Sequence, residues 1–206
     1  MKPYQNEKSS KKKQVEKMFD SISLEYDKLN RLISAGNDVK WRENIYKIAN
    51  PLNPIDILDI ATGTADIALE LSKIKDSKVT GLDISEKMLD VGRQKVADRN
   101  LNDKVVLISG DAENLNFSKN SFDLILMDVH LPGINGTEAT SEIRKFNNKI
   151  PIVALTAISL NENREMLLSY GMNDVITKPF EPETVIATIG QALLMHRDAD
   201  MNAQAA

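Results

Sequence analysis

Two aspartates stand where predicted strands end, and carboxylates at such positions can bind a nucleoside. Asp83 ends the stretch "KVTGLD", about 20 residues after a strand-to-helix turn, where an acid can accept hydrogen bonds from both ribose hydroxyls. Asp111 follows "VVLISG" and is suited to bonding an adenine edge. Each acid alone could be a helix cap or an exposed turn residue. Their order along successive strands favours a nucleoside site.

The turn that precedes them, "LDIATGTAD" at residues 58–66, is built from small side chains. Such a turn between a strand and a helix lets a ligand approach the backbone at the helix N-terminus. Gly63 and Thr64 lie at its centre. By itself the turn is a weak indication of a ligand site. Together with the two aspartates it makes such a site a stronger prediction.

A third aspartate, Asp128, ends the apolar stretch "FDLILMD" and precedes the loop "VHLPGING". A carboxylate held at such a strand end is typical of a phosphate acceptor or a metal ligand. Either chemistry needs further acidic groups close by. The loop after the first strand of the sheet is where such partners are expected.

The composition fits one soluble α/β domain with a helical extension. The 206 residues are 42% apolar and 27% charged, with a net charge of −4 that gives no general attraction to nucleic acid. No apolar run is long enough to span a membrane, and no apolar signal core begins the chain. The absence of cysteine excludes disulfides and thiolate chemistry and fits the cytoplasm. Two histidines, His130 and His196, are too few for a histidine-rich zinc site.

Strand and helix patterns alternate after a helical N-terminal region. Residues 1–13 are polar and predict a flexible tail, residues 14–50 predict a helical cap, and residues 197–206 predict a loose tail. Between the cap and the last tail, strands are expected at 55–61, 78–83, 104–109, 122–128, 151–156 and 174–177, and the last helix at 181–195.

This alternation predicts a three-layer, doubly wound parallel sheet with six strands in the order 3-2-1-4-5-6. The crevice between the carboxyl ends of strands one and four is then the expected ligand site.

The first part of the chain resembles a known enzyme class. Residues 14–123 are similar to class I S-adenosylmethionine-dependent methyltransferases, and to the menaquinone/ubiquinone-biosynthesis C-methyltransferase family in particular. The resemblance rests on "VEKMFDSISLEYDKLNRLISAGNDVKWR", "ILDIATGTADIALEL", "VTGLDISEKMLDVGRQK" and "GDAENLNF". It implies S-adenosylmethionine or S-adenosylhomocysteine as ligand. The Gly63 backbone and Thr64 would lie by the methionine part, Asp83 by the ribose, and Asp111 with Ala112 by the adenine.

Two alanines depart from the common pattern of that class. Ala61 and Ala65 stand where many methyltransferases have glycine. Alanine is tolerated at these positions if φ is negative, although its methyl group could narrow the pocket.

The second part resembles the back half of a response-regulator receiver domain, which is flavodoxin-like. The resemblance rests on "DLILMDVHLPGINGTEATSEIR", "PIVALTA" and "GMNDVITKPF". It implies a phosphoacceptor at Asp128, a switch hydroxyl at Thr156 and a charge-neutralising ammonium at Lys178.

A receiver also needs an acidic pair at the end of its first strand to hold Mg²⁺. In this chain Thr62 and Gly63 lie near that place. Bound Mg²⁺ is therefore not expected, and the three receiver-like residues are interpreted as a vestigial phosphoacceptor site.

The two resemblances together predict a Rossmann-like/flavodoxin-like hybrid. One fused domain, 51–196, would contain a methyltransferase-like cofactor half at 51–121 and a receiver-like half at 122–196. We interpret the chain as an engineered chimeric scaffold, monomeric and not an enzyme, that could retain weak binding of the nucleoside cofactor. The alternatives are an active S-adenosylmethionine-dependent quinone C-methyltransferase and a phosphoaccepting receiver module.

Overall fold

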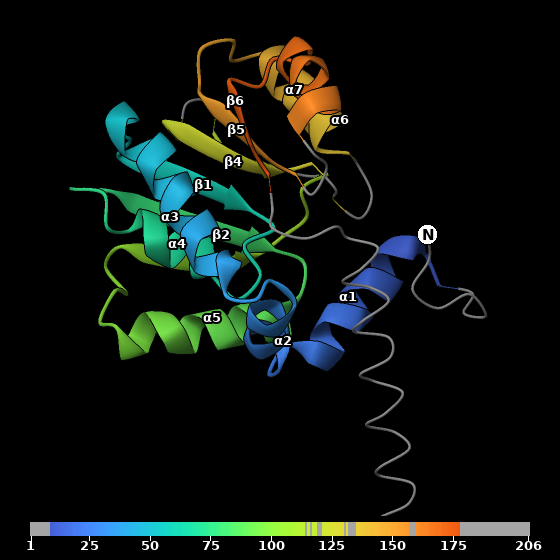
Figure 1. The fold of residues 1–206 in the computed structure, drawn as a ribbon, viewed down its shortest axis with the longest axis vertical. Coiled ribbons are helices and arrows are strands. Elements are labelled where there is room, and N and C mark those ends of the chain that lie inside the picture. The colour runs from blue at the N-terminus through green and yellow to red at the C-terminus, as the bar shows by residue number, and fades with distance from the viewer. Residues whose placement is uncertain are drawn as a thin grey trace, which may run out of the picture.

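A single parallel sheet forms the centre of the structure. The computed structural model describes residues 9–113, 115, 117–118, 121–129, 131, 135–156 and 160–177. The strand order is β3-β2-β1-β4-β5-β6, which confirms the predicted α/β fold (Figure 1). The strands are β1 (Asp56–Ile60), β2 (Lys78–Asp83), β3 (Val105–Ser109), β4 (Leu124–Asp128), β5 (Ile152–Thr156) and β6 (Asp174–Thr177).

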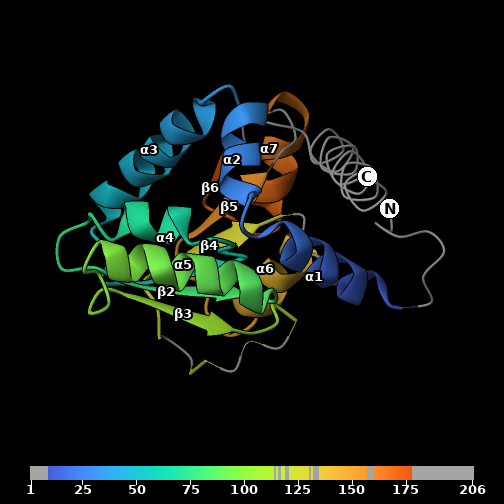
Figure 2. The ribbon, with the colours of Figure 1, turned by 90° about the horizontal axis from the view of Figure 1, so that it is seen from below.

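Helices cover both faces of this sheet, as Figures 1 and 2 show. One face packs against α3 (Asn37–Ala49), α4 (Asp66–Leu71) and α5 (Glu86–Asp98), and the other against α6 (Gly136–Arg144) and α7 (Leu160–Ser169). Successive strand residues point to opposite faces, so that Ile57 belongs to the first core and Leu58 to the second. The strands are continuously apolar because both faces are buried.

The N-terminal helices precede the sheet. They are α1 (Lys11–Ile22), α2 (Tyr26–Ile33) and α3, which continues into the short 3-10 helix η1 (Asn50–Leu52) at Pro51. Ser10 caps α1 by accepting a hydrogen bond from the backbone N–H of Lys13. The helix therefore begins within the lysine-rich segment "KKK". Met18 and Ile22 anchor α1 through their buried side chains.

Two caps fix the helices that follow strands. The Ser85 hydroxyl accepts a hydrogen bond from the Met88 N–H at the start of α5. Asn135 and Glu138 form a capping box at the start of α6. Both helices therefore start at defined points beside the carboxyl ends of their strands.

The last part of the chain lies outside the described residues. This applies to Lys178, to the helix expected at 181–195 and to the tail at 197–206. In the described part, no helix combines the length and the apolar character that crossing a bilayer requires.

Candidate functional site

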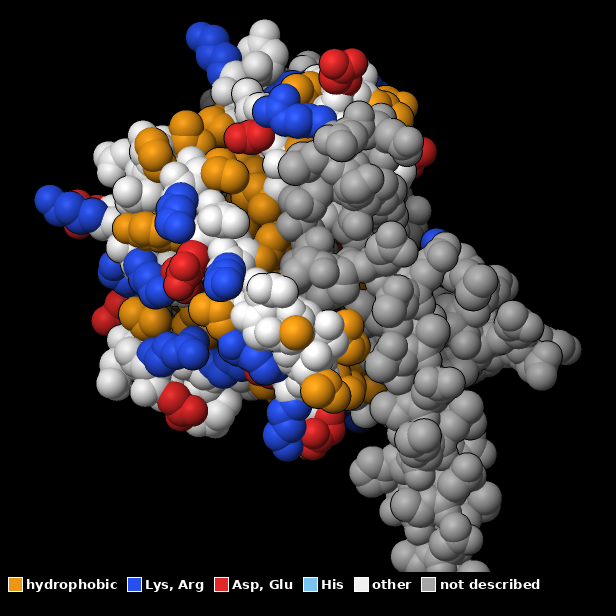
Figure 3. Space-filling model, viewed as in Figure 1, with side chains coloured by type: hydrophobic (Ala, Val, Ile, Leu, Met, Phe, Trp, Pro, Cys, Tyr) orange, Lys and Arg blue, Asp and Glu red, His pale blue; other side chains and the backbone are white. Residues whose placement is uncertain are grey.

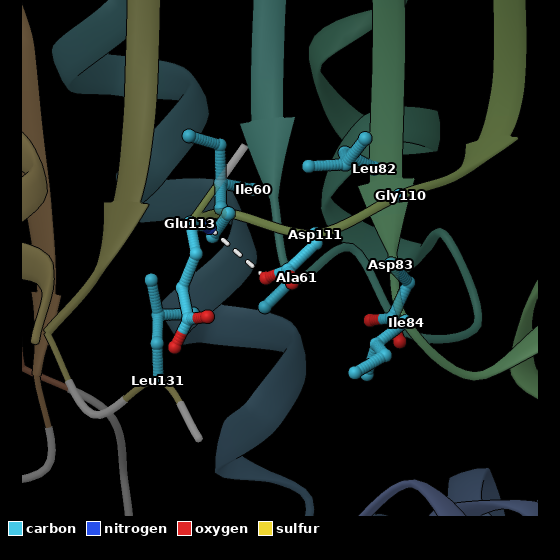
Figure 4. Close-up of a pocket in the computed structure, with 10 residues that line it drawn as sticks. Ile60, Ala61, Leu82, Asp83, Ile84, Gly110, Asp111, Glu113 and Leu131 are labelled. Atoms are coloured by element: carbon cyan, nitrogen blue, oxygen red, sulfur yellow. Dashed lines mark hydrogen bonds between the residues drawn. The ribbon is translucent and has the colours of Figure 1, made fainter. Parts of the chain in front are cut away.

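A pocket lies at the carboxyl ends of β1, β2 and β3 (Figure 4). Its empty volume is about 360 Å³, including space that is open to solvent. In Figure 4, Leu131 and Glu113 lie on one side and Asp83 and Ile84 on the other. The lining residues are Ile60, Ala61, Leu82, Asp83, Ile84, Gly110, Asp111, Ala112, Glu113 and Leu131. The pocket thus contains three of the predicted cofactor residues, Asp83, Asp111 and Ala112.

The turn after β1 has an unusual backbone. Ala61, Gly63 and Ala65 have φ angles of 64°, 57° and 66°, so every second residue is left-handed. The condition under which alanine was expected to be tolerated, a negative φ, is therefore not met. A left-handed alanine costs about 1–2 kcal/mol, because its Cβ crowds the following carbonyl oxygen. The turn must be held in place by its surroundings.

Asp83 is one group that holds the turn. Its Oδ2 accepts a hydrogen bond of 2.8 Å from the Gly63 N–H, and its Oδ1 accepts one of 2.9 Å from the Ser85 N–H. Burial raises the pKa of the Asp83 carboxyl, the backbone hydrogen bonds act in the opposite direction, and the charge of Asp128 raises it further. Asp83 is thus both a pocket residue and a link between the turn and β2.

Thr64 lies in a polar interface instead of the pocket. Its side chain is almost fully buried, with 2% of the residue exposed. Its hydroxyl donates to Asp27 Oδ1 at 2.6 Å and accepts from Lys95 Nζ at 3.0 Å. The role predicted for Thr64 beside a ligand stays a prediction, and in this structure its hydroxyl contacts α2 and α5.

Lys95 extends that interface. Its ammonium lies 2.6 Å from Asp27 Oδ2 and 2.6 Å from Asp66 Oδ1. Asp66 also pairs with Arg42 of α3 at 2.8 Å. We call this group, Asp27, Arg42, Thr64, Asp66 and Lys95, the cap network, because it joins α2 and α3 to the turn and to α5.

The first helix also reaches the pocket. Lys12 of α1 forms ion pairs with Asp111 and with Glu113, the latter at 3.1 Å. Asp20 of α1 accepts a hydrogen bond of 2.7 Å from the Ser85 hydroxyl. The cap therefore closes one side of the pocket, a point on which the sequence patterns give no prediction.

Tyr26 at the start of α2 is a further site residue that the sequence patterns do not single out. Its ring packs edge-on against Phe19, with centroids 6.1 Å apart. Burial raises the pKa of its phenol, and the nearby carboxylates of Asp128 and Asp83 raise it further. Tyr26 thus lies near enough to Asp83 and Asp128 for their charges to act on it, although it is not one of the residues that line the pocket.

Comparison with known proteins decides what kind of chain carries this pocket. Residues 7–145 match the ubiE/COQ5 methyltransferase family. The chain belongs to that family. The family implies S-adenosylmethionine as the methyl donor, and the acidic pocket at the ends of β1–β3 fits such a ligand.

Its relatives include named enzymes. The demethylmenaquinone methyltransferase of Bacteroides fragilis is 32% identical over 198 residues, which are 94% of this chain and 76% of the relative. That of Porphyromonas gingivalis is 36% identical over 74% of this chain and 64% of the relative. A putative S-adenosylmethionine-dependent methyltransferase of Methanococcus maripaludis shares the fold, with a TM-score of 0.53, 22% identity and coverage of 81% and 72% of the two chains.

These matches correct the interpretation of the second half. The family match continues to residue 145, past the expected junction at 121–122, and includes Asp128. The comparisons give no support to a receiver domain, so the interpretation as an engineered chimera with a receiver-like half is wrong. The phosphoacceptor assignment of Asp128, Thr156 and Lys178 stays a prediction that nothing here tests. The expectation of a chain without enzymatic activity is also wrong, because the relative that matches 94% of it is a methyltransferase.

The sheet is continuous across the expected junction, as the prediction of one fused domain also required. β4 pairs with β1 in parallel register, Ile57 opposite Leu124. Core residues from both expected halves pack in the same two clusters. A buried strand that ends in aspartate before a loop is compatible with more than one doubly wound fold, and this local pattern misled the sequence interpretation.

Of the three residues assigned to the receiver, the structure describes Asp128 and Thr156. Asp128 ends β4 and contributes to the field at Tyr26 and Asp83. Thr156 ends β5 and is buried. Lys178 lies outside the described residues. Within the described ranges, no cluster of three or more potential metal ligands occurs.

Proposed function

We propose that this chain transfers a methyl group from S-adenosylmethionine to a ring carbon of a reduced demethylmenaquinone. One observation carries the proposal: a chain with an acidic pocket at the ends of β1–β3 aligns over 94% of its length with the demethylmenaquinone methyltransferase of Bacteroides fragilis. The pocket supports the donor, and the relative supports the acceptor.

We assign the donor's ribose to Asp83. Each of its oxygens already accepts one backbone N–H, and a carboxylate oxygen can accept a second hydrogen bond, so both ribose hydroxyls can be bound. Asp111 and Ala112 would border the adenine, and the Gly63 backbone the methionine part. Thr64 would act indirectly, by fixing the turn through the cap network.

The charge of the cleft suits a cationic donor. The carboxylates of Asp128 and Asp83 both raise the pKa of Tyr26, which indicates a negative field at this place. Such a field favours the sulfonium form over the demethylated product, whose sulfur is uncharged. Product release is therefore aided by the loss of that charge.

The chemical step needs orientation and a proton acceptor. S-adenosylmethionine supplies an electrophilic methyl group on a positively charged sulfur. Tyr26 stays protonated at neutral pH because burial and the carboxylates raise its pKa, so it can donate a hydrogen bond to an oxygen of the acceptor. We assign the ring proton that the new carbon–carbon bond displaces to Asp128, the carboxylate at the end of β4.

The test is a methyl-transfer assay with methyl-labelled donor and chemically reduced demethylmenaquinone in detergent. We expect label in menaquinone with the wild-type chain, no transfer with Asp83→Ala, and a lower kcat with an unchanged donor KM for Asp128→Asn. Calorimetry with S-adenosylhomocysteine separates the two parts of the proposal. Binding without methylation refutes the quinol acceptor, and absence of binding refutes the donor site.

A further inference from the structure

Two threonines anchor the turn after β1 to different parts of the molecule. Thr62 and Thr64 alternate with the three left-handed residues of the turn, and both are buried, with 6% and 2% exposed. The Thr62 hydroxyl donates a hydrogen bond of 2.6 Å to Asp59 Oδ2 on β1. The Thr64 hydroxyl donates one of 2.6 Å to Asp27 Oδ1 on α2. The sheet therefore holds the turn at one threonine, and the helical cap holds it at the other.

Lys95 of α5 reinforces the contact to the cap. Its ammonium lies 3.0 Å from the Thr64 hydroxyl oxygen and 2.6 Å from Asp27 Oδ2, so each of the three side chains contacts the other two. Figure 3 shows charged side chains of both signs interspersed on the surface over α3 and α5, where water screens ion pairs. The Lys95 side chain is only 18% exposed, so its contacts are screened less than those of the surface.

The turn depends on these contacts because its backbone is strained. Two of its three left-handed residues are alanines, for which this conformation is unfavourable. A strained backbone persists only where its surroundings determine it. Gly63, which directly precedes Thr64, donates its N–H to Asp83, the residue to which we assign the ribose. Without the contact between Thr64 and Asp27, the turn would be free to relax next to the donor site.

The helix on the other side of this contact, α2, has few apolar anchors. No residue of α2 is fully buried, whereas α1 buries Met18 and Ile22 and α3 buries Ile45. Elements with few buried apolar contacts open at a low cost in free energy. The docking of α2 can therefore respond to a change at the turn while the sheet stays folded.

We propose that Thr64 and Lys95 are positioning residues that, through Asp27, couple donor binding at the turn to the docking of α2. This inference rests on the proposed function, because it takes the assigned donor site as given. Docked α2 holds the turn in the conformation that binds the donor, and by thermodynamic linkage a bound donor holds α2 to the same extent. Asp27 directly follows Tyr26, so donor binding also fixes the phenol that we assign to the acceptor.

The test combines calorimetry with amide hydrogen exchange and uses S-adenosylhomocysteine as the probe. In the wild-type chain, we expect the bound ligand to slow the exchange of the α2 amides. Thr64→Val removes the hydroxyl but keeps the shape of the side chain, and it should weaken ligand binding about tenfold. At saturating ligand, this variant should no longer show slower exchange in α2. Thr64→Ser keeps the hydroxyl and should restore both effects.

Asp27→Ala breaks the same contact from the cap side, at a residue whose side chain is 36% exposed. It should reproduce both effects of Thr64→Val, and it serves as the test if the threonine variant does not fold. Combining the two substitutions should weaken binding about tenfold, like either one alone, because both remove one contact. A loss of about a hundredfold in the double variant would show two independent effects and would contradict the coupling.

The matched control is Thr62→Val, since Thr62 makes an equally short hydrogen bond in the same turn, but to the sheet. At saturating ligand, this variant should keep the slower exchange of α2. The proposal is overturned if Thr62→Val loses that protection as Thr64→Val does, or if the ligand binds to the wild-type chain without slowing exchange in α2. If the wild-type chain binds no ligand, the donor site of the proposed function fails, and the coupling fails with it.

Discussion

Replacing the two left-handed alanines by glycine should have unequal effects on stability, although the two sites have nearly the same φ. Ala61 is exposed at the pocket, and Ala65 is fully buried at 0% exposure. Their φ angles of 64° and 66° imply a similar steric cost of about 1–2 kcal/mol each. The difference must therefore come from what each methyl group contacts.

For Ala61→Gly, the relief of the steric strain of a left-handed alanine is the largest effect. Glycine makes the unfolded chain more flexible, which costs about 0.4–1 kcal/mol. Little apolar contact is lost at an exposed site. We therefore expect the free energy of unfolding to rise by about 0.5–1 kcal/mol, from the relief of about 1–2 kcal/mol less the entropic cost.

For Ala65→Gly, the lost methyl group offsets the relief. A methyl group added at Gly92 would lie only 3.0 Å from the Ala65 Cβ, which shows how closely α5 packs on this residue. Burial of one such group contributes about 0.8 kcal/mol. The expected net change is close to zero, and Ala61→Gly should be the more stable variant.

Urea unfolding, followed by circular dichroism, measures the change in the free energy of unfolding for both variants. The slope of that free energy against urea concentration should stay unchanged if the native and unfolded states keep their compactness. Ala68→Gly, in the buried interior of α4, is the control for an ordinary helical site and should destabilise by about 1 kcal/mol or more. A loss of stability in Ala61→Gly comparable to that control would refute the left-handed backbone at residue 61. Equal gains at both alanines would refute the role of burial.

Three further substitutions test the site. Asp83→Asn should weaken S-adenosylhomocysteine binding at least about tenfold in calorimetry. Because burial raises the pKa of Asp83, binding to the wild-type chain should weaken as pH falls through that raised pKa, and binding to the variant should not. An identical pH profile for the two chains would contradict the assignment of Asp83 to the ribose. Because the pKa of Asp83 is higher in the folded protein than in the unfolded chain, its contribution to the free energy of unfolding is complete below the unfolded-state pKa. That contribution is lost as pH rises through the folded-state pKa. Lys12→Met should strengthen cofactor binding about two- to fivefold, since it releases Asp111 from its ion pair with Lys12. The control Lys13→Met, at an exposed neighbouring residue, should leave binding unchanged. Weaker binding in Lys12→Met would show that the lysine helps to hold the ligand. Lys95→Met should lower the free energy of unfolding by about 2 kcal/mol, because it leaves carboxylates of the cap network without their counter-charge. Lys95→Arg should recover part of the lost free energy. If Lys95→Met is as stable as the wild-type chain in thermal or urea unfolding, the network does not stabilise the fold.

The fold could be predicted because burial on both faces dictates the strand patterns. The stretches expected at 78–83 and 174–177 coincide with β2 and β6, and parallel pairing with right-handed connections leaves few strand orders.

The candidate site could be predicted only where it depends on strand ends. Asp83 and Asp111 line the pocket because Asp83 ends β2 and Asp111 follows β3, strands whose positions the sequence determines. Lys12, Tyr26 and Lys95 could not be found in this way. Their roles arise from the docking of the cap on the sheet, and local periodicity carries no information about which side chains then meet.

The interpretation of the second half failed for a related reason. The stretch around Asp128 specifies a buried strand and a following loop, and those features are shared by different doubly wound sheets. Only a comparison over a long part of the chain, here residues 7–145, separates the possibilities. The pairing of β4 with β1 does not separate them, because it belongs to the strand order that both interpretations predict.

The strand order has a consequence for how the chain is made on the ribosome. β1 is an inner strand between β2 and β4, but β4 begins only at Leu124, long after β1 ends at Ile60. At about 5–20 residues per second, roughly 3–13 s pass between the synthesis of the two strands. During that time one edge of β1 has no partner strand, and its unpaired backbone N–H and C=O groups are open to pairing with other nascent chains. The order in which the sheet is completed therefore leaves a period before β4 emerges in which this protein is prone to aggregate.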